Sequence, residues 1–192
     1  MTVGRGALNR TLQLTAGKRA LASLRLSDIA AVFNLIQQGS RRGHFTRLYT
    51  RPRYIAGLGI QLFALVLTSR IRLPDGISYR AASKVLIVDG RFAGFVILRQ
   101  VSPAETEIYM CALSDEYRGK GLGKWMLANA LAETPANHRI SATCRAASES
   151  MRSVLIALGF GRDLRGTQIG IQRFLLSANS RSELRLSVEP SN

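Results

Sequence analysis

Residues 106–133 place a short apolar run, a polar turn, a glycine-rich segment and an amphipathic segment directly after one another. The run at residues 108–113 is apolar and rich in strand-forming residues, so it predicts a buried strand. Residues 118–124 (RGKGLGK) then put three glycines and three cations just before a predicted helix. The first amides of a helix lack partners and carry partial positive charge, and glycine lets a ligand approach the backbone closely. This segment therefore predicts an anion-binding loop, most plausibly for phosphate.

The spacing within this loop excludes two common nucleotide-binding motifs. A dinucleotide fingerprint G-x-G-x-x-G would need its third glycine at the position of Lys124. A Walker A loop would need glycine in place of Arg118 and Ser or Thr in place of Trp125. The pattern that fits is [Q/R]-x-x-G-x-[G/A], which Arg118, Gly121 and Gly123 satisfy. With a strand before it and a helix after it, the loop resembles the pyrophosphate loop for acetyl-CoA of the GCN5-related N-acetyltransferase (GNAT) superfamily.

The rest of the chain shows an element order that is also that of the GNAT fold. Strand patterns occur at residues 21–26, 84–88, 92–98, 108–113, 139–145, 161–166 and 169–176, and helix patterns at 28–38, 54–70, 121–133 and 149–158. Ser27 and Asp28 are expected to cap the first helix. The order β-α-α-β-β-β-α-β-α-β-β predicts one α/β domain with a mixed central sheet flanked by helices. We expect a GNAT-like acetyltransferase domain over residues 20–177, between a loose basic N-terminal segment (1–19) and a polar C-terminal tail (178–192).

The resemblance implies which residues contact acetyl-CoA, the expected co-substrate. In the family, the loop holds the pyrophosphate through backbone amides, and here its residues are Arg118, Gly119, Lys120, Gly121, Leu122, Gly123 and Lys124. The preceding strand lends backbone groups to the pantetheine arm, which implies that role for Cys111, Ala112 and Leu113, with the Leu113 amide donating to the thioester oxygen. Ser148 stands where the family commonly has an asparagine, and it is assigned to the same site.

The resemblance also implies two catalytic residues. Residues 106–112 are similar to the strand of the histone acetyltransferase branch whose catalytic glutamate falls on Glu107, which makes Glu107 the candidate general base. The alternative is a strand-end carboxylate paired with one of the many arginines. Strand alternation is expected to place Glu107, Tyr109 and Cys111 on one face, and Ile108 and Met110 on the other.

One position departs from the family pattern. Many members place a tyrosine four residues before the Gly-Phe pair, where it protonates the leaving thiolate, but this chain has Leu155 there. Tyr109, Ser148, Ser153 or water remain as candidates for that proton, and Tyr109 is our second candidate catalytic residue. A thiolate is a tolerable leaving group near neutral pH, so the loss of the tyrosine does not exclude activity.

The formal charge of +15 is concentrated in the N-terminal part of the chain. Residues 1–53 carry ten Arg and Lys against one acid, whereas residues 101–192 carry eleven against nine. An arginine-rich surface favours an amine-bearing acceptor that is itself acidic or carries a phosphate group. The open alternatives are a solvated surface, attraction of CoA alone, or a nucleic-acid contact through the basic N-terminal half. In the last case the chain would be a non-catalytic CoA- or nucleic-acid-binding module on a GNAT-like fold.

The remaining features concern redox state, metals and location. Cys111 and Cys144 lie in predicted strands, and His44 and His138 are isolated, so we expect reduced thiols, no metal and a cytoplasmic protein. Residues 1–26 are free of acids and contain Arg, Ser and Thr, as transit peptides do, but a loose leader is preferred.

The segment at residues 54–68 is apolar on nearly every side and flanked by arginines. It is too short, and too interrupted by Gln61, to predict a membrane span. We expect a buried helix or a homodimer contact, with docking at a membrane surface as the alternative.

Overall fold

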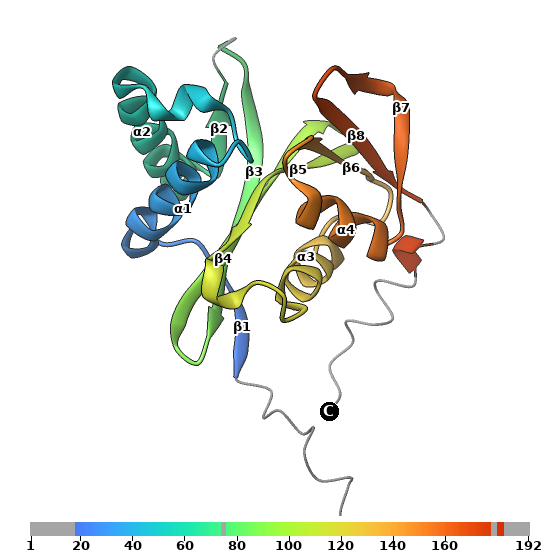
Figure 1. Cartoon of the computed structure of the whole chain (residues 1–192), viewed down its shortest axis with the longest axis horizontal. Coiled ribbons are helices and arrows are strands. Elements are labelled where there is room, and N and C mark those ends of the chain that lie inside the picture. The colour runs from blue at the N-terminus through green and yellow to red at the C-terminus, as the bar shows by residue number, and fades with distance from the viewer. Residues whose placement is uncertain (1–17, 74–75, 178–179, 183–192) are drawn as a thin grey trace, which may run out of the picture.

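The computed structural model describes residues 18–73, 76–177 and 180–182, which form a mixed α/β fold (Figure 1). The strands are β1 (Arg19–Ser23), β2 (Arg70–Arg72), β3 (Ser78–Val88), β4 (Arg91–Ser102), β5 (Glu105–Leu113), β6 (Arg139–Arg145), β7 (Phe160–Gln168) and β8 (Ile171–Leu176). The helices are α1 (Ile29–Arg41), α2 (Pro52–Thr68), α3 (Leu122–Ala132) and α4 (Glu149–Ala157), with 3₁₀ turns η1 (Leu26–Asp28), η2 (Arg47–Thr50) and η3 (Asp115–Tyr117). Most of the expected N-terminal segment (1–19) and C-terminal tail (178–192) lies outside the described residues.

The strands form one sheet in the order β1-β3-β4-β5-β6-β8-β7, and β2 pairs with β3. Neighbouring strands are antiparallel except for β5 and β6, which are parallel. A parallel pair needs a crossover connection, and helix α3 provides it. The glycine-rich loop is therefore the start of a β-α-β crossover, at the end of β5.

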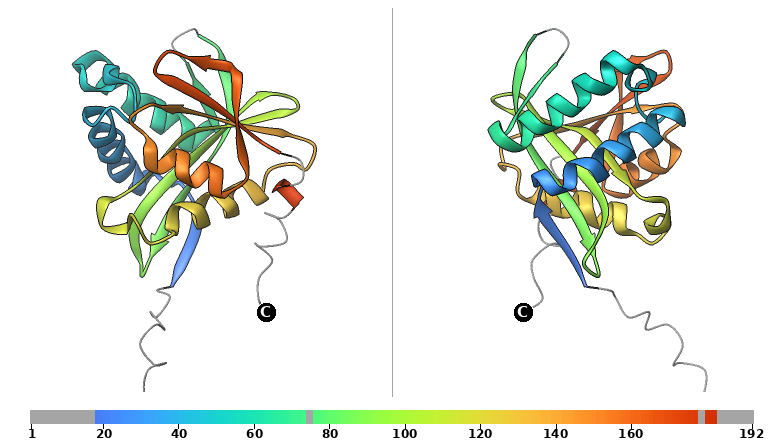
Figure 2. Two further views of the ribbon diagram at one scale, coloured as in Figure 1. Left: turned by 45° about the vertical axis from the view of Figure 1, so that its right-hand side comes forward. Right: turned by 90° about the vertical axis from the view of Figure 1, so that its left-hand side faces the viewer.

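Helices cover the two faces of the sheet in pairs (Figures 1 and 2). Helices α1 and α2 pack on one face through a core that includes Ile36, Leu62 and Phe95. Helices α3 and α4 pack on the other face through a second core that includes Met126 and Leu155. The apolar patterns of the helices explain this arrangement, because each buries one stripe against the sheet.

The element order expected from the sequence is confirmed, with one additional strand and one corrected cap. Strand β2 spans three residues, which is too short for a recognisable alternation pattern. Asp28 does not cap α1, because its Oδ2 accepts from the Arg25 amide at 2.9 Å and so closes the preceding turn η1. The cap position of α1 makes no side-chain hydrogen bond.

A β-bulge in β5 changes which side chains share a face. Ile97 and Leu98 of β4 pair with Met110 and Ile108, so Tyr109 is the extra residue. Ile108 consequently packs in the core under α3 and α4, whereas Met110 packs in the core under α1 and α2. Tyr109 packs against the α1 and α2 core and Cys111 against the other. The expectation that Tyr109 and Cys111 share a face, and Ile108 and Met110 the other, is therefore wrong.

Gly94 on β4 lies opposite Leu113, at the end of β5 from which the glycine-rich loop departs. A Cβ atom at Gly94 would overlap the Ala112 carbonyl oxygen and the Leu113 side chain, and a backbone oxygen in a sheet cannot move cheaply. We expect Gly94→Ala to lower the free energy of unfolding by about 1–3 kcal/mol, measured by urea denaturation.

The matched control is Gly161→Ala on β7, where an added Cβ meets nothing within 4 Å. Equal stability of the two variants would show that the close approach at Gly94 does not constrain β5.

Candidate active site

Strands β5 and β6 pair only at their beginnings. Residues 105–108 of β5 pair with residues 139–142 of β6, after which β5 stays paired with β4 and β6 with β8. The divergence opens a cleft of ≈ 500 Å³. Of the residues predicted from the sequence, those lining it are Glu107, Tyr109, Cys111, Ala112, Leu113, Arg118, Gly123 and Ser148. Gly119, Lys120, Gly121, Leu122 and Lys124 are not among the lining residues and continue the same loop into α3.

The glycine-rich loop owes its shape to two left-handed residues. Gly119 and Gly121 have φ of +72° and +73°, a region that residues with a Cβ rarely adopt. Gly121 caps α3, and its carbonyl accepts the Trp125 amide at 3.1 Å. The amides of residues 122–124 precede this first helical hydrogen bond and have no intrahelical acceptor. The loop thus presents three backbone donors at the positive end of a helix, a geometry suited to phosphate.

The Arg118 side chain fastens this loop to its surroundings. Its Nε donates to the Leu113 carbonyl at 3.2 Å, and its Nη1 lies 3.1 Å from Asp115 Oδ1. Arg42, the residue just after α1, also binds Asp115, with both contacts at 2.7 Å. The hydrogen bond from Arg42 is the main cause that holds the pKa of Asp115 below its usual value. Arg118 therefore positions the loop as well as adding charge to it.

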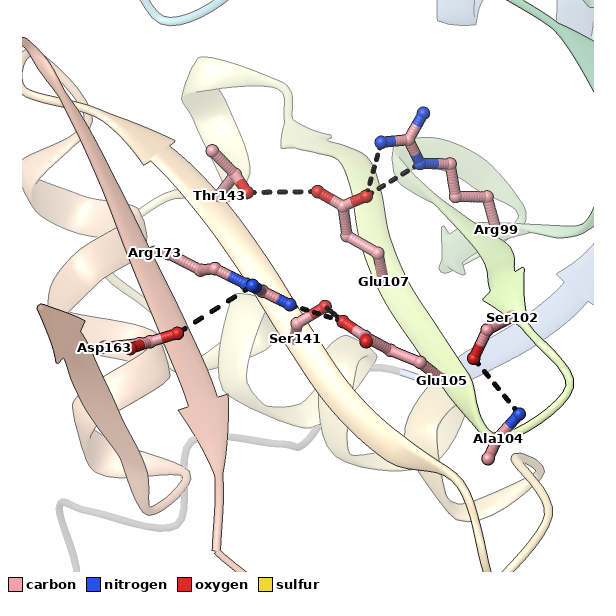
Figure 3. Close-up of polar contacts among 9 residues, drawn as sticks. All are labelled: Arg99, Ser102, Ala104, Glu105, Glu107, Ser141, Thr143, Asp163 and Arg173. Atoms are coloured by element: carbon pink, nitrogen blue, oxygen red, sulfur yellow. Dashed lines mark hydrogen bonds and ion pairs between the residues drawn. The ribbon is translucent and has the colours of Figure 1, made fainter. Parts of the chain in front are cut away.

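The Glu107 carboxylate is held between two strands (Figure 3). Arg99 of β4 donates to Oε2 from Nε at 2.7 Å, and its Nη2 lies 2.7 Å from the same oxygen. Thr143 of β6 donates to Oε1 at 3.0 Å. The side chains of Glu107 and Arg99 are 12% and 18% exposed, so the pair is largely withdrawn from water. The arginine pairing that was the alternative expectation for Glu107 is therefore present, and the paired carboxylate also lines the cleft.

Tyr109 and Arg99 form a stacked group beside that pair. The Arg99 guanidinium lies over the rings of Tyr109 and Tyr79, at 4.7 and 5.2 Å from their centroids. Burial, together with the neighbouring Tyr49, raises the pKa of Tyr109 far above its ordinary value. Tyr109 therefore keeps its proton at any working pH and can serve the cleft as a hydrogen-bonding phenol.

Two cysteines line the wall formed by the diverging strands. Burial raises the pKa of Cys111 to about 12 and that of Cys144 to about 11. Cys111 Sγ donates to Met151 Sδ at 3.3 Å. Both side chains are neutral thiols at physiological pH, consistent with the reduced cysteines expected from the sequence.

Leu155 and Ser148 differ in whether they reach the cleft, where a proton donor to the leaving thiolate would be needed. Leu155 is fully buried in the core beneath α4. Ser148 lies in the cleft wall as the cap residue of α4, and its side chain makes no capping hydrogen bond. A side chain at residue 155 would face the core. The cleft wall therefore contains the hydroxyl of Ser148, just before α4, but no phenol from residue 155.

Arg99 and Thr143 were missed by the sequence analysis. A two-residue turn at Pro103 and Ala104 would have placed Gln100 opposite Glu107, and the register shift between Gln100 and Ser102 makes Arg99 the partner instead, so the turn alone did not identify it. Thr143 lies two residues beyond Ser141, the β6 partner of Glu107, and no local pattern marks it. Its contact depends on the parallel register of strands that are far apart in the sequence.

The described part of the chain contains no group of three or more His, Cys, Asp and Glu side chains arranged to hold a metal ion. None of its helices is long and apolar enough to cross a membrane.

Comparison with known proteins gives a family and several similar folds. The profile of the acetyltransferase (GNAT) family matches residues 64–160. RimJ of Mycobacterium smegmatis in complex with a CoA disulfide is 18% identical, with a TM-score of 0.60 and 90% of each chain covered. The acetyltransferase yncA of Salmonella typhimurium, described as putative and solved with acetyl-CoA, is 14% identical, with a TM-score of 0.63 and 84% and 94% covered. Spermidine N-acetyltransferase of Vibrio cholerae, solved with CoA and spermine, is 13% identical, with a TM-score of 0.62 and 85% and 98% covered. No curated protein sequence matches the chain significantly.

Proposed function

The chain belongs to the acetyltransferase (GNAT) family, and from this we propose that it transfers the acetyl group of acetyl-CoA to a primary amine on an acidic or phosphate-bearing acceptor. The observation that carries the proposal is the glycine-rich loop, which lies at the end of β5 where β5 and β6 diverge. Similar folds solved with CoA or acetyl-CoA support the choice of co-substrate. The acetyltransferase activity is that of the family, whereas the acceptor class rests on charge.

The loop and the diverging strand divide the binding of acetyl-CoA between them. The amides of residues 122–124 would bind the pyrophosphate, because a helix start offers unpaired donors and positive charge. Beyond residue 108, β5 has no ladder with β6, so its backbone groups on that side are available to the pantetheine arm. The Leu113 amide is the donor we assign to the thioester oxygen, where it would stabilise the tetrahedral oxyanion.

The proposed reaction is direct attack of the acceptor amine on acetyl-CoA while both are bound in the cleft. The amine nitrogen bonds to the thioester carbon and the carbon–sulfur bond breaks, so the products are the N-acetylated amine and the CoA thiolate, which takes a proton from water. Glu107, directly or through a water, is the proposed acceptor of the amine proton, because the Thr143 hydroxyl can rotate away and free Oε1. Arg99 fixes the carboxylate from the opposite side. Tyr109 is the proposed hydrogen-bond donor to the substrate.

The charge of the cleft supports an anionic acceptor. Arg99 is paired with Glu107, whereas Arg118 shares the single carboxylate of Asp115 with Arg42, so one positive charge of this group is uncompensated. Arg145, at the end of β6, also lines the cleft and forms no ion pair with the described residues. It is the group that we expect to attract a carboxylate or phosphate on the acceptor.

The first prediction concerns the loop. We expect Gly121→Asp to weaken acetyl-CoA binding at least about tenfold in calorimetric titration, because a carboxylate at the positive helix end repels phosphate and φ of +73° strains the residue. The control is Gly76→Asp just before β3, where φ is +83° and the nearest atom lies 4.0 Å away, at the end of the β3–β4 ladder opposite the one that holds Gly94. Equal losses in both variants would indicate backbone strain alone, and a wild-type protein that binds no acetyl-CoA would contradict the proposal.

The second prediction concerns the base. We expect Glu107→Gln to lower kcat about a hundredfold or more, with the KM for acetyl-CoA nearly unchanged. The control is Glu105→Gln on the same strand, which removes a carboxylate paired with Arg173 at 2.7 Å outside the cleft. Wild-type turnover in Glu107→Gln would remove Glu107 from the mechanism, and binding of CoA without turnover on any amine would favour a non-catalytic module.

The third prediction concerns the acceptor. We expect Arg145→Gln to raise the KM for a primary amine that bears a phosphate about tenfold, and to leave the KM for a neutral amine unchanged. Arg162→Gln, at an exposed arginine of β7 outside the cleft lining, is the control for net charge. The same KM change in both variants, or for both amines, would contradict an anion-binding role for Arg145.

A further inference from the structure

Helix α2 has an exposed apolar stripe in addition to the face that it packs on the sheet. Ile60, Phe63 and Leu67 are 72%, 51% and 60% exposed. They recur at spacings of three and four, so they lie on one side of the helix, and Ala56 and Arg53 extend the same side toward its start. Isolated exposed apolar residues are ordinary, but a continuous stripe on one helix indicates an interaction surface.

The opposite side of α2 explains why this stripe is not needed for folding. Leu58, Leu62 and Leu65 are each at most 2% exposed and pack against the sheet with α1. From its sequence, a helix that is apolar on nearly every side is expected to be buried or to contact a partner. The structure buries one side only, and α2 lies at the outside of the molecule (Figures 1 and 2).

The surface around the stripe is strongly basic. Arg51 and Arg53 at the start of α2, and Arg70 and Arg72 just after its end, are exposed and form no ion pair with any described residue. Between Asp28 and Asp89 the sequence contains nine Arg and Lys and one acid. The partner of this surface must therefore offer both apolar and anionic groups.

We propose that α2 docks the protein on the surface of an anionic lipid bilayer. The helix lies in the plane of the interface, with Ile60, Phe63 and Leu67 inserted among the acyl chains near the headgroups. The arginines at both helix ends lie at the level of the anionic headgroups, where each cation adds to the attraction. Docking of this kind needs no spanning helix, in keeping with the length and composition of the described helices.

Other occupants fit these observations less well. A second copy of the chain would bring the arginines of two equivalent surfaces together, and that repulsion opposes a symmetric dimer. A nucleic acid would use the arginines but leave the apolar stripe in water. A partner helix would need a groove to enter, whereas α2 presents the convex side of a single helix.

The test is flotation of the full-length protein with vesicles of phosphatidylcholine and phosphatidylserine in equal parts. We expect the wild type to float with these vesicles, to float weakly with phosphatidylcholine alone, and to release at high salt. We expect Ile60→Ser combined with Phe63→Ser to lower the partition coefficient about tenfold, because the inserted apolar area is lost. The unfolding temperature verifies that the exposed substitutions leave the fold intact.

The matched control is Ile156→Ser combined with Leu164→Ser, which removes two side chains that are 63% and 75% exposed elsewhere on the protein. This control should float like the wild type. Absence of flotation, or flotation that survives the loss of Ile60 and Phe63, would overturn the proposal. So would a concentration-dependent dimer that the α2 variant abolishes, or binding to RNA that the vesicles do not displace. None of these measurements depends on acetyl transfer.

Discussion

Strand β5 has two neighbours in the sheet, and it remains paired along its length with only one of them. The ladder to β4 continues to Leu113, whereas the ladder to β6 stops after Ile108. The separation occurs next to the bulge at Tyr109, and bulges increase the local twist of a strand. The cleft, the unpaired backbone edge of β5 and the direction of the glycine-rich loop all follow from this divergence. Gly94 completes the arrangement, because only a residue without a side chain lets β4 follow the end of β5 so closely.

Polar side chains join the strands on the side of the sheet that carries Glu107 (Figure 3). Glu105 accepts from Ser141 and from Arg173, both at 2.7 Å, and thereby connects β5 to β6 and β8. One step further along, Glu107 connects β4 to β6 through Arg99 and Thr143. The first cluster lies where β5 and β6 are still paired, and the second lies where the ladder ends. The position along one strand therefore distinguishes a carboxylate that supports the sheet from one that faces the cleft.

Local sequence was sufficient for much of the fold, because the strand, loop and helix at residues 106–133 each depend on neighbours in the chain. The motif glycines were identified from their spacing, and of these Gly121 is left-handed whereas Gly123 lies inside α3; the second left-handed glycine, Gly119, stands at an unspecified position of the motif. The bulge could not be predicted, since it is a mismatch between two strands, and it placed Cys111 and Tyr109 on different faces. The exposed side of α2 could not be predicted from the sequence either. A helix with apolar residues on every side is expected to be buried, and its sequence does not indicate which side the sheet covers. The α2 stripe thus became visible only when the packing of α2 was known.

The side chains of the cleft differ in whether they could donate a proton to the leaving thiolate. An ordinary thiol has a pKa of about 8.5, whereas burial raises the pKa of Cys111 to about 12 and that of Tyr109 still higher. A group with the higher pKa is a poor proton donor to a departing thiolate, so these side chains can orient and solvate the sulfur but scarcely protonate it. Residue 155, where the family pattern has a tyrosine, is a leucine buried in the core, so it offers the cleft no phenol. In the reaction that we propose, Glu107 accepts the amine proton, so the thiolate takes its proton from water. Acceleration consequently depends on holding the amine beside the thioester and stabilising the oxyanion, for which the backbone of β5 is the structural requirement.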